Sequence, residues 1–420
     1  MSIFSTDGDY HRTILKNGIR IVSEKMNSGR SVSFGVWVTT GSRNENQKNN
    51  GVSHLLEHMV FKGTKTRNAF EIASSLESLG GHLNAFTDRE FTCYYALVLD
   101  DNILNAVEVI TDLIQNAVFN TQELEKEKSV IFEEIQNMED SPEDLIQDWF
   151  YQNIFDDHSL GNPILGTKYS IQHIDRKTLK EYWKQKYTAN NIIIACSGLV
   201  DHNYLVACVE KNINKLKEGS RFIPHSVKLS ERTSVMKNAP IQQCHIYTGI
   251  PTFEYTNPQK FALVLLNQIL GGGMSSRLFQ LLREEEGLVY SIYSFLDFWS
   301  DIGLFNVYTG TSSKNSDDAL ESIYRVFSNL CQNGISDSEL QNAQSYLTRS
   351  LILSSEDSSN RMNRLAKMEI YGQSYKPLSN IIERIQAVKK EEIHSVADLI
   401  LSKRQRFITR IQPNTLYVGG

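Results

Sequence analysis

Three residues whose types and spacing could do chemistry lie close together in the string GVSHLLEHMVFKGT: His54, Glu57 and His58. On a helix, residues three and four positions apart share one face, so both imidazoles and the carboxylate would point to the same side. Neutral imidazole is a good ligand for Zn²⁺, and a third protein ligand would leave one tetrahedral position open, as in catalytic zinc sites. Glu57 would then be placed to take a proton from a water molecule there. The pattern predicts half of a catalytic zinc site.

The alternative interpretation is an amphipathic helix that carries three unrelated polar residues. Against it, the neighbouring Leu55, Leu56 and Met59 make the same helix largely apolar. Its polar residues would be partly buried, and burying ionisable groups without a partner is costly. A shared metal ion accounts for all three polar residues together.

A third ligand should come from a helix that can pack against the first one. The best candidate is the strongly helical segment QELEKEKSVIFEEIQNMED, residues 122–140. Glu127 and Glu134 are seven positions apart and would lie two turns apart on one face, so one could bind the metal while the other orients a ligand. The spacing alone does not choose between them and leaves Glu133 open. An acidic helix of this kind can also be an ordinary solvated face.

The positioning elements occur twice along the chain. The helix–turn–helix pattern of His58–Phe70 returns, roughly 210 positions later, in Asn267–Phe279. The strand, polar turn and helix of Phe91–Asn116 return in Gly303–Leu330. We therefore predict an α+β fold of two homologous domains of about 200 residues, each a β-sheet packed against helices.

The predicted boundaries are 1–215 for the metal-binding domain and 241–420 for a degenerate domain without metal. Between them, residues 216–240 are rich in Lys, Ser and Pro and show little periodicity, which is typical of a linker. The alternative for this range is a long surface loop with a short strand inside one domain.

Composition excludes several classes of protein. The formal net charge of −6 argues against broad attraction to nucleic acid or to an anionic membrane. No apolar run approaches the length of a membrane helix, and residues 1–11 resemble neither a secretory signal nor a transit peptide. Five widely spaced cysteines suit buried free thiols in a reducing compartment. We expect a cytoplasmic protein that has no nucleic-acid or membrane partner.

Four strings together, HLLEH, FKGT, LNAFTDREFTCYY and EKEKSVIFEEI, resemble the pitrilysin/insulinase metallopeptidases, the inverted zincins with the signature H-x-x-E-H. Within that family the chain is most similar to the subunits of mitochondrial processing peptidase and their bacterial relatives. The resemblance covers nearly the whole chain, including its duplication. It implies that the two domains form a clamshell-like peptidase chamber.

The resemblance also implies a set of roles at the metal site. His54, His58 and Glu134 would bind one Zn²⁺ per subunit, because the family's distal ligand is the second carboxylate of the VIxxE string. Glu57 would be the general base, and Glu127 falls on the family's accessory glutamate. One small departure is Lys128, where family members often have Arg.

The segment Leu83–Tyr94 alternates and follows two glycines, so it is predicted to be an edge strand. In the family, the equivalent strand accepts the substrate peptide by β-addition. The resemblance implies that Asn84, Ala85 and Phe86 line the substrate groove. On its pattern alone, Phe86 would be interpreted as a core aromatic residue.

In the second half the metal motif is replaced by Leu263, Leu266 and Asn267, so no metal is expected there. Arg283 and Tyr290 match family residues that hold the substrate backbone and help to stabilise the tetrahedral intermediate. The resemblance thus implies that the second copy contributes to catalysis without binding zinc.

The expected function is a zinc-dependent endopeptidase that hydrolyses short or unfolded peptides. Family chambers use four modules, and a chain of this length supplies two, which implies a homodimer or a heterodimer with a paralogous subunit. The alternative is a non-catalytic structural or assembly subunit of the same fold. Such subunits typically have damaged metal motifs, whereas the motif here is intact.

Overall fold

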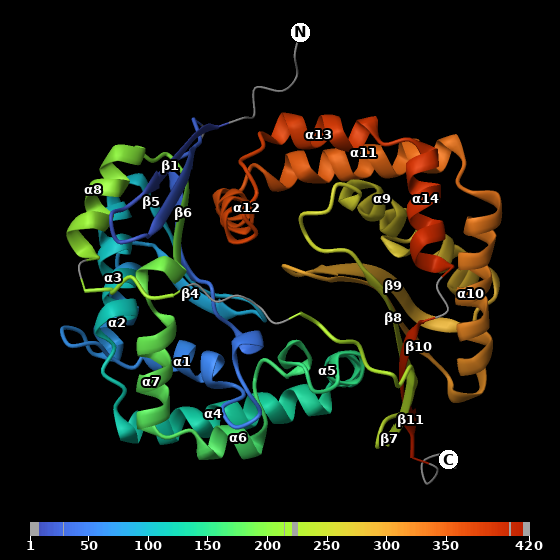
Figure 1. Ribbon diagram of the computed structural model, residues 1–420, viewed down its shortest axis with the longest axis horizontal. Helices are drawn as coiled ribbons and strands as arrows, with labels where there is room; N and C mark the ends of the chain where they lie inside the picture. The colour runs from blue at the N-terminus through green and yellow to red at the C-terminus, as the bar shows by residue number, and fades with distance from the viewer. Residues whose placement is uncertain (1–7, 28, 214, 221–225, 403–404, 415–420) are drawn as a thin grey trace. The chain divides into compact units, whose positions relative to one another are not determined.

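The computed structural model describes residues 8–27, 29–213, 215–220, 226–402 and 405–414 (Figure 1). The chain divides into two compact units, each assembled from three segments. The first unit comprises Met1–Gln136, Asn162–His225 and Leu353–Leu378, and the second comprises Asn137–Gly161, Ser226–Ile352 and Ser379–Gly420.

The first unit contains a six-stranded sheet in the order β1-β2-β6-β3-β5-β4. Strands β2 and β6 are parallel, and the other neighbours are antiparallel. The edge strand β4 therefore has one neighbour, β5. The strands are β1 (Asp9–Ile14), β2 (Arg20–Lys25), β3 (Ser31–Val38), β4 (His82–Thr87), β5 (Thr92–Leu99) and β6 (Ile192–Gly198).

Both faces of this sheet are covered. On β3, Val36 packs into a core with the helices that follow the strands in sequence, while the next residue, Trp37, packs against the opposite layer. This follows from the alternation of side chains along a strand. The first layer is built mainly from α1 (Val52–Val60), α2 (Ala69–Glu77), α3 (Ile103–Asn116), α4 (Thr121–Asp140), α6 (Lys168–His173), α7 (Arg176–Lys186) and α8 (His202–Asn212), and the opposite layer is α12 (Ser358–Ile370).

The second unit repeats this topology in five strands, ordered β7-β11-β8-β10-β9. Its parallel pair β7 and β11 corresponds to β2 and β6, and its edge strand β9 corresponds to β4. This repeat confirms the predicted α+β fold of two homologous domains. The strands are β7 (Ser234–Ala239), β8 (Cys244–Thr252), β9 (Val289–Phe298), β10 (Gly303–Thr311) and β11 (Phe407–Pro413).

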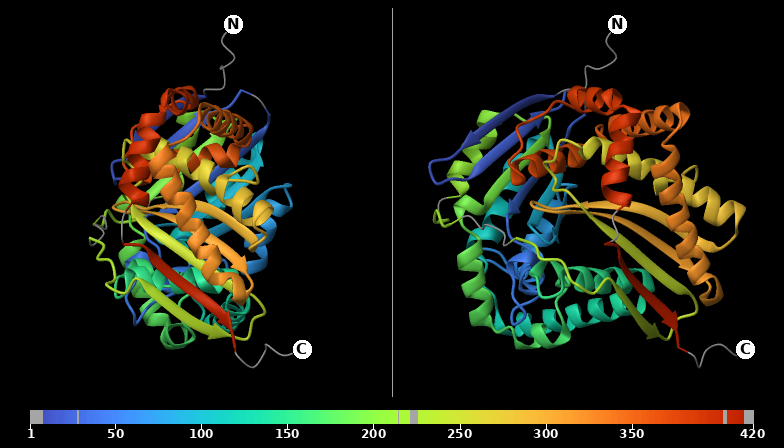
Figure 2. Two further views of the ribbon diagram at one scale, coloured as in Figure 1. Left: turned by 90° about the vertical axis from the view of Figure 1, so that its right-hand side faces the viewer. Right: turned by 45° about the vertical axis from the view of Figure 1, so that its right-hand side comes forward.

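Helices also cover both faces of the second sheet. The helix α5 (Pro142–Phe155) packs on β8 and β11, and α9 (Lys260–Gly271), α10 (Ser316–Asn333) and α14 (Lys390–Leu401) pack on the other face (Figure 2). A π-helix at Phe279–Glu285 follows α9 at the position that α2 holds after α1. The unit also contains α11 (Asp337–Ser354, with its last residues in the first unit) and α13 (Leu378–Ala387).

The units are discontinuous because two equivalent helices are exchanged. α5 comes from the first half of the sequence and packs in the second unit, whereas α12 comes from the second half and packs on β2, β3 and β6 of the first unit. The predicted domains 1–215 and 241–420 are contiguous, so they do not describe this exchange. As boundaries of the repeat in the sequence, they stay a prediction. Of the predicted linker 216–240, residues 226–240 belong to the second unit and include β7, and residues 221–225 lie outside the described residues.

The prediction of one edge strand over Leu83–Tyr94 is wrong in its extent. β4 ends at Thr87 and β5 begins at Thr92, so the segment is a hairpin. The Asp88 N–H donates to the Phe91 carbonyl at 2.8 Å, and the Arg89 N–H donates to the Asp88 carboxylate at 2.5 Å. These bonds close the turn and leave β4 alone at the edge.

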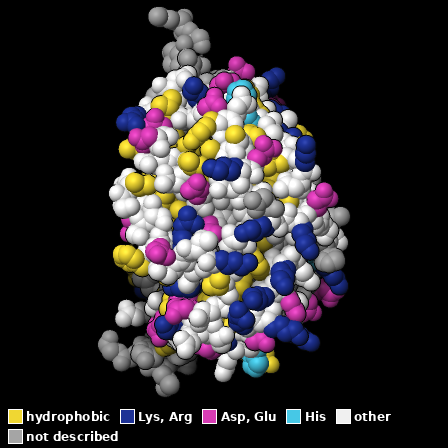
Figure 3. Space-filling view, turned by 90° about the vertical axis from the view of Figure 1, so that its left-hand side faces the viewer, with side chains coloured by type: hydrophobic (Ala, Val, Ile, Leu, Met, Phe, Trp, Pro, Cys, Tyr) yellow, Lys and Arg dark blue, Asp and Glu magenta, His cyan; other side chains and the backbone are white. Residues whose placement is uncertain are grey.

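Surface charge is mixed in sign. The face drawn in Figure 3 carries both basic and acidic side chains among uncharged ones, in keeping with the small net charge. No helix within the described ranges has the length and apolar character needed to cross a bilayer.

Candidate metal centre

Helix α1 positions the residues that the sequence singled out. Its apolar side chains, among them Leu55, Leu56 and Met59, are fully buried in the core of the first unit. The remaining face carries His54, Glu57 and His58, all partly buried. The burial of one helix face thus fixes the direction of the other.

Helix α4 brings a third side chain to this face. Ligand atoms of His54, His58 and Glu134 all lie within 4.8 Å of one another. The Nε2 atoms of His54 and His58 are each 3.7 Å from an oxygen of Glu134, which is too long for a hydrogen bond. Two atoms bound to one zinc ion at 2.0–2.2 Å in tetrahedral geometry are about 3.4 Å apart, close to this spacing.

A buried carboxylate oxygen without a hydrogen-bond partner also fits a metal ion at this cluster. His54 Nδ1 and Glu134 Oε2 are buried and have no hydrogen-bond partner. Leaving such atoms unpaired costs free energy, whereas a shared cation would satisfy the carboxylate. Two imidazoles and one carboxylate are a donor set that suits zinc. Within the described ranges, this is the one group of three or more His, Cys, Asp or Glu residues close enough to hold a metal ion.

Of the three glutamates that the spacing left open, only Glu134 lies in this cluster. Glu127 is buried beside the other side of His58, where its carboxylate accepts from Nδ1 at 3.0 Å and from Lys62 Nζ at 2.8 Å. This bond holds the imidazole with Nε2 directed toward Glu134, the usual arrangement of a metal-binding histidine. Glu133 is exposed.

Burial shapes the electrostatics of the cluster. Burial, followed by the nearby His58, lowers the pKa of His54 to about 3, so the imidazole is neutral and can bind a cation. Burial also raises the pKa of Glu57, while a hydrogen bond from Thr87 opposes the rise. The Thr87 hydroxyl donates to Glu57 Oε2 at 2.5 Å. This bond orients the carboxylate and connects α1 with the end of β4.

The predicted groove residues Asn84, Ala85 and Phe86 lie on the edge strand β4. Because side chains alternate, Ala85 and Thr87 face the side of α1, while Asn84 and Phe86 face the opposite side. Phe86 is 37 % exposed and meets Phe91 and Tyr95 edge-on, so it is not an enclosed core residue. Among the described strands, none pairs with the outer backbone groups of β4.

Arg283 and Tyr290 lie in the second unit, whereas the metal cluster lies in the first. The Arg283 guanidinium lies over the Phe279 ring, 4.9 Å from its centre. Tyr290 lies on the edge strand β9 and is 60 % exposed. Both are accessible for contacts, and their catalytic roles stay predictions. At the positions equivalent to the zinc motif, Leu263 and Leu266 are fully buried.

Two neighbours of the cluster were not predicted from the sequence. Thr87 directly follows the predicted groove residues, and this position was the one available signal for its role. Lys62 lies one turn after His58 and pairs with Glu127. The role of Lys62 depends on how α4 packs against α1, and the local sequence around Lys62 does not predict that packing.

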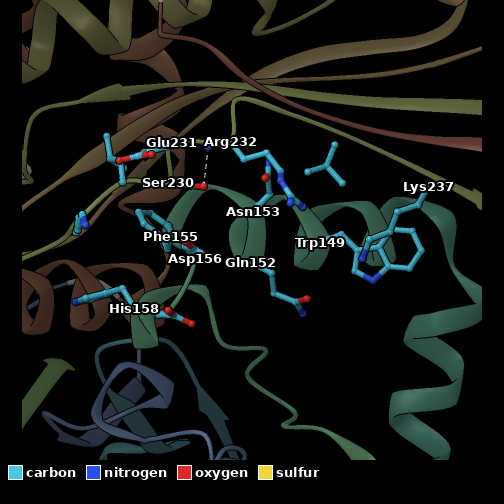
Figure 4. A pocket seen from close by; sticks show the side chains of 14 residues that line it. Trp149, Gln152, Asn153, Phe155, Asp156, His158, Ser230, Glu231, Arg232 and Lys237 are labelled. Carbon is cyan, nitrogen blue, oxygen red and sulfur yellow. Dashed lines mark hydrogen bonds between the residues drawn. The ribbon is translucent and has the colours of Figure 1, made fainter.

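A separate cavity of about 550 Å³ lies in the second unit, between α5 and the segment before and within β7 (Figure 4). The Lys237 ammonium lies 3.8 Å from the centre of the Trp149 ring on one side of it. The cavity is lined by equal numbers of basic and acidic side chains, so its charge indicates no particular ligand. Apart from His158, they are Lys228, Arg232 and Lys237 against Asp156, Asp157 and Glu231.

Two family models match consecutive parts of the chain. Residues 20–168 match the family model described as Insulinase (Peptidase family M16). Residues 173–347 match the model described as Peptidase M16 inactive domain. The second match begins at residue 173, inside the first unit, so the two matches do not test the predicted domain boundaries.

Relatives are similar over almost their full lengths. A Bacillus subtilis protein described as an uncharacterized zinc protease is 37 % identical over 92 % of this chain and 94 % of its own. A Streptomyces coelicolor protein with the same description is 35 % identical over 94 % of this chain and 88 % of its own.

Solved structures share the fold at lower identity. A protease from Helicobacter pylori has a TM-score of 0.89 at 21 % identity and covers 97 % of this chain and all of its own. A Pseudomonas fluorescens structure described as a peptidase M16 inactive domain has a TM-score of 0.90 at 20 % identity, with 97 % and 99 % covered.

Proposed function

The chain belongs to the insulinase family of peptidases, peptidase family M16, and we propose that it is a zinc-dependent endopeptidase. The observation that carries this proposal is the convergence of His54, His58 and Glu134. His54 and His58 share one face of α1 with Glu57, and Glu134 reaches the two histidines from α4. The described residues contain one such cluster, which suggests the proposed stoichiometry of one zinc ion per subunit.

His54, His58 and Glu134 would hold the ion, and Glu127 would orient His58 through Nδ1. Bound zinc would supply a Lewis acid that polarises a carbonyl and makes water acidic near neutral pH. The three protein ligands leave room for a fourth, as catalytic zinc sites do.

Glu57 is the proposed general base. Its carboxylate takes a proton from the attacking water and later gives that proton to the nitrogen of the leaving amine. The Thr87 hydroxyl, which donates to Oε2, leaves Oε1 available for this transfer. Burial of Glu57 raises its pKa, which makes the carboxylate a stronger base than an exposed glutamate.

The proposed substrates are short or unfolded peptides. An extended peptide can add to the free edge of β4 through main-chain hydrogen bonds, which suit almost any sequence. β4 ends at Thr87, which contacts the proposed base, so a peptide on this edge would run toward the metal cluster. Folded proteins rarely offer such an extended segment.

We propose that the protein acts in the cytoplasm, because all five cysteines are free and four of them are buried.

The alternative function, a structural or assembly subunit, requires neither a metal cluster nor a base. The intact cluster favours the peptidase.

The direct test is metal analysis of the purified protein combined with hydrolysis of a mixed peptide library. We expect about one zinc ion per chain and peptide cleavage that a chelator abolishes and added zinc restores. Glu133→Gln, which changes an exposed glutamate beside the cluster, serves as the control and should behave like the wild type. A metal-free protein, or one that binds zinc and cleaves nothing in the library, would favour the structural subunit.

A further inference from the structure

The metal-binding helix begins without a capping side chain of its own. The residue before α1 is Gly51, with φ of +88°, and the first turn of any helix exposes backbone N–H groups that need acceptors. A side chain at position 51 is excluded, because a Cβ there would lie 2.6 Å from Ile171 Cδ1 and 2.7 Å from the Leu165 carbonyl oxygen. The acceptor must therefore come from elsewhere.

Glu45, six residues earlier, supplies the acceptors. Its Oε2 accepts from the Gly51 N–H at 2.7 Å and from Asn50 Nδ2 at 3.0 Å, and its Oε1 accepts from the Ser53 N–H at 2.7 Å. Both oxygens are thus used at the start of α1. The residue is only 5 % exposed, so these bonds are shielded from water.

The loop that carries Glu45 is itself fixed. The Ser42 and Arg43 N–H groups donate to the carbonyls of Asp88 and Arg89 in the β4–β5 turn, and the Glu45 N–H donates to the Ser42 carbonyl. On the other side, the Tyr182 hydroxyl of α7 lies 2.8 Å from Ser53 Oγ. The backbone that carries Glu45 is thus attached to the β4–β5 turn, separately from α1.

Burying a carboxylate costs free energy that an apolar residue would not cost. In agreement, burial raises the pKa of Glu45 to about 7, although hydrogen bonds from Ser53, Gly51 and Asn50 oppose the rise. Negative charge is favourable at the positive end of the helix dipole, and the two bonded N–H groups define where the first turn lies. A buried carboxylate is thus a poor choice for stabilising the fold in general. Its directed bonds to two N–H groups are well suited to fixing the position of a helix.

We propose that Glu45 is a positioning residue of the metal centre: it fixes the start and rotation of α1, and so directs His54 and His58 toward Glu134. His54 follows Ser53, one of the two residues whose N–H Glu45 holds, and His58 lies one turn further along. The part of this inference that concerns zinc rests on the proposed function, whereas the part that concerns α1 does not.

The test compares Glu45→Gln with wild type in the full-length chain. The amide keeps the size of the side chain but must place an NH₂ group against an N–H donor on one side. We expect hydrogen exchange at the Gly51 and Ser53 amides of the zinc-free protein to speed up at least tenfold. Zinc affinity, measured by competition with a chelator, should fall about 10–100-fold, as for other residues that orient metal ligands.

The matched control is Glu24→Gln, which changes another buried carboxylate of the first unit, one that pairs with Arg361 and Arg364 of α12. It should lower the melting temperature without changing zinc affinity or exchange at α1. If Glu45→Gln does not fold, Glu45→Asp keeps the charge, is one methylene shorter and should show the same effects in weaker form.

Unchanged zinc affinity in a folded Glu45 variant, or an equal loss in Glu24→Gln, would overturn the proposal. If the wild type binds no zinc, the proposed function fails, but the role of Glu45 at the start of α1 can still be tested. Hydrogen exchange in the zinc-free protein then provides that test. Faster exchange at Ser53 in the Glu45 variant alone would then support Glu45 as the anchor of α1, and unchanged exchange would refute it.

Discussion

At the scale of single residues, the metal centre consists of polar groups buried to different degrees and with different partners. Glu127 is satisfied by His58 and Lys62, and Glu57 by Thr87. Glu134 Oε2 has no hydrogen-bond partner. An unsatisfied buried polar atom costs roughly 1–3 kcal/mol, so a carboxylate kept in this state is best explained by a cation it can bind.

Glu134→Gln should therefore remove most of the zinc, because the amide is a much weaker ligand than the carboxylate. The comparison is Glu133→Gln, in which the preceding exposed glutamate loses its charge. Both proteins are purified with equal zinc supply, and zinc per chain is measured by elemental analysis. If Glu133→Gln loses the metal and Glu134→Gln keeps it, the ligand assignment is wrong.

The pKa of Glu45 predicts a pH dependence of stability. Folding raises this pKa from an ordinary value near 4.5 to about 7, so the folded chain holds the proton more tightly than the unfolded chain. The contribution of Glu45 to stability therefore falls as pH rises from about 4.5 to about 7, by at most about 1.4 kcal/mol for each tenfold drop in proton concentration, and is constant at higher pH. Tyr182, the titratable neighbour on α7, stays neutral because burial raises its pKa further.

Urea denaturation of the zinc-free wild type and Glu45→Gln at pH 5 and pH 8 measures this contribution. The stability of the wild type relative to the variant should be lower at pH 8 than at pH 5. An equal difference at both pH values would show that the carboxyl group has an ordinary pKa in the folded chain.

At the scale of elements, the sequence predicted what is local. The 3.6-residue pattern of α1 placed His54, Glu57 and His58 on one face, and the seven-residue spacing placed Glu127 and Glu134 on one face of α4. Which glutamate binds depends on how α4 packs against α1, so the spacing alone could not decide it. The contacts of Glu45 with α1 and of Thr87 with Glu57 likewise join separate elements.

The attachment of α12 to the first sheet combines apolar and ionic contacts. Met362 and Leu365 pack against Trp37, and the fully buried Glu24 of β2 pairs with Arg361 and Arg364. Glu369, near the end of α12, pairs with Arg12 and Arg20. A buried ion pair gives direction to an attachment, and losing one partner is costly.

Arg361→Met should lower the free energy of unfolding by about 3 kcal/mol, because Glu24 then keeps only one of its partners. The control is Arg410→Met in the second unit, whose partner Asp317 is 85 % exposed and should change stability by less than about 1 kcal/mol. Urea denaturation of both variants checks the comparison. Equal effects would mean that burial of the pair around Glu24 carries no special weight.

At the scale of the whole molecule, the duplication was readable from the sequence and the exchange of α5 and α12 was not. The repeated patterns predicted two similar α+β units, and the matching strand orders confirm them. The apolar face of α5 or α12 indicates only that the helix is buried, and either sheet could cover it.

We propose that the chain works as a dimer, most simply a homodimer, in which Arg283 and Tyr290 of one subunit complete the zinc site of the other. A His58→Ala chain lacks the metal site, and an Arg283→Ala/Tyr290→Ala chain lacks the second-unit residues. Co-expression of the two should restore about one working site per mixed dimer. Mixed dimers as inactive as either parent, or an active species that sediments as a monomer, would refute a shared site.

The central claim, hydrolysis by a zinc-bound cluster with Glu57 as the base, is tested most directly by Glu57→Gln. The amide fits the same space and can still accept from Thr87, but it cannot take a proton from water. Zinc content and peptide hydrolysis are measured on one preparation. We predict about one zinc ion per chain, as in wild type, with hydrolysis reduced by at least about 10²–10⁴-fold. Turnover close to that of the wild type in the zinc-loaded variant would contradict this mechanism.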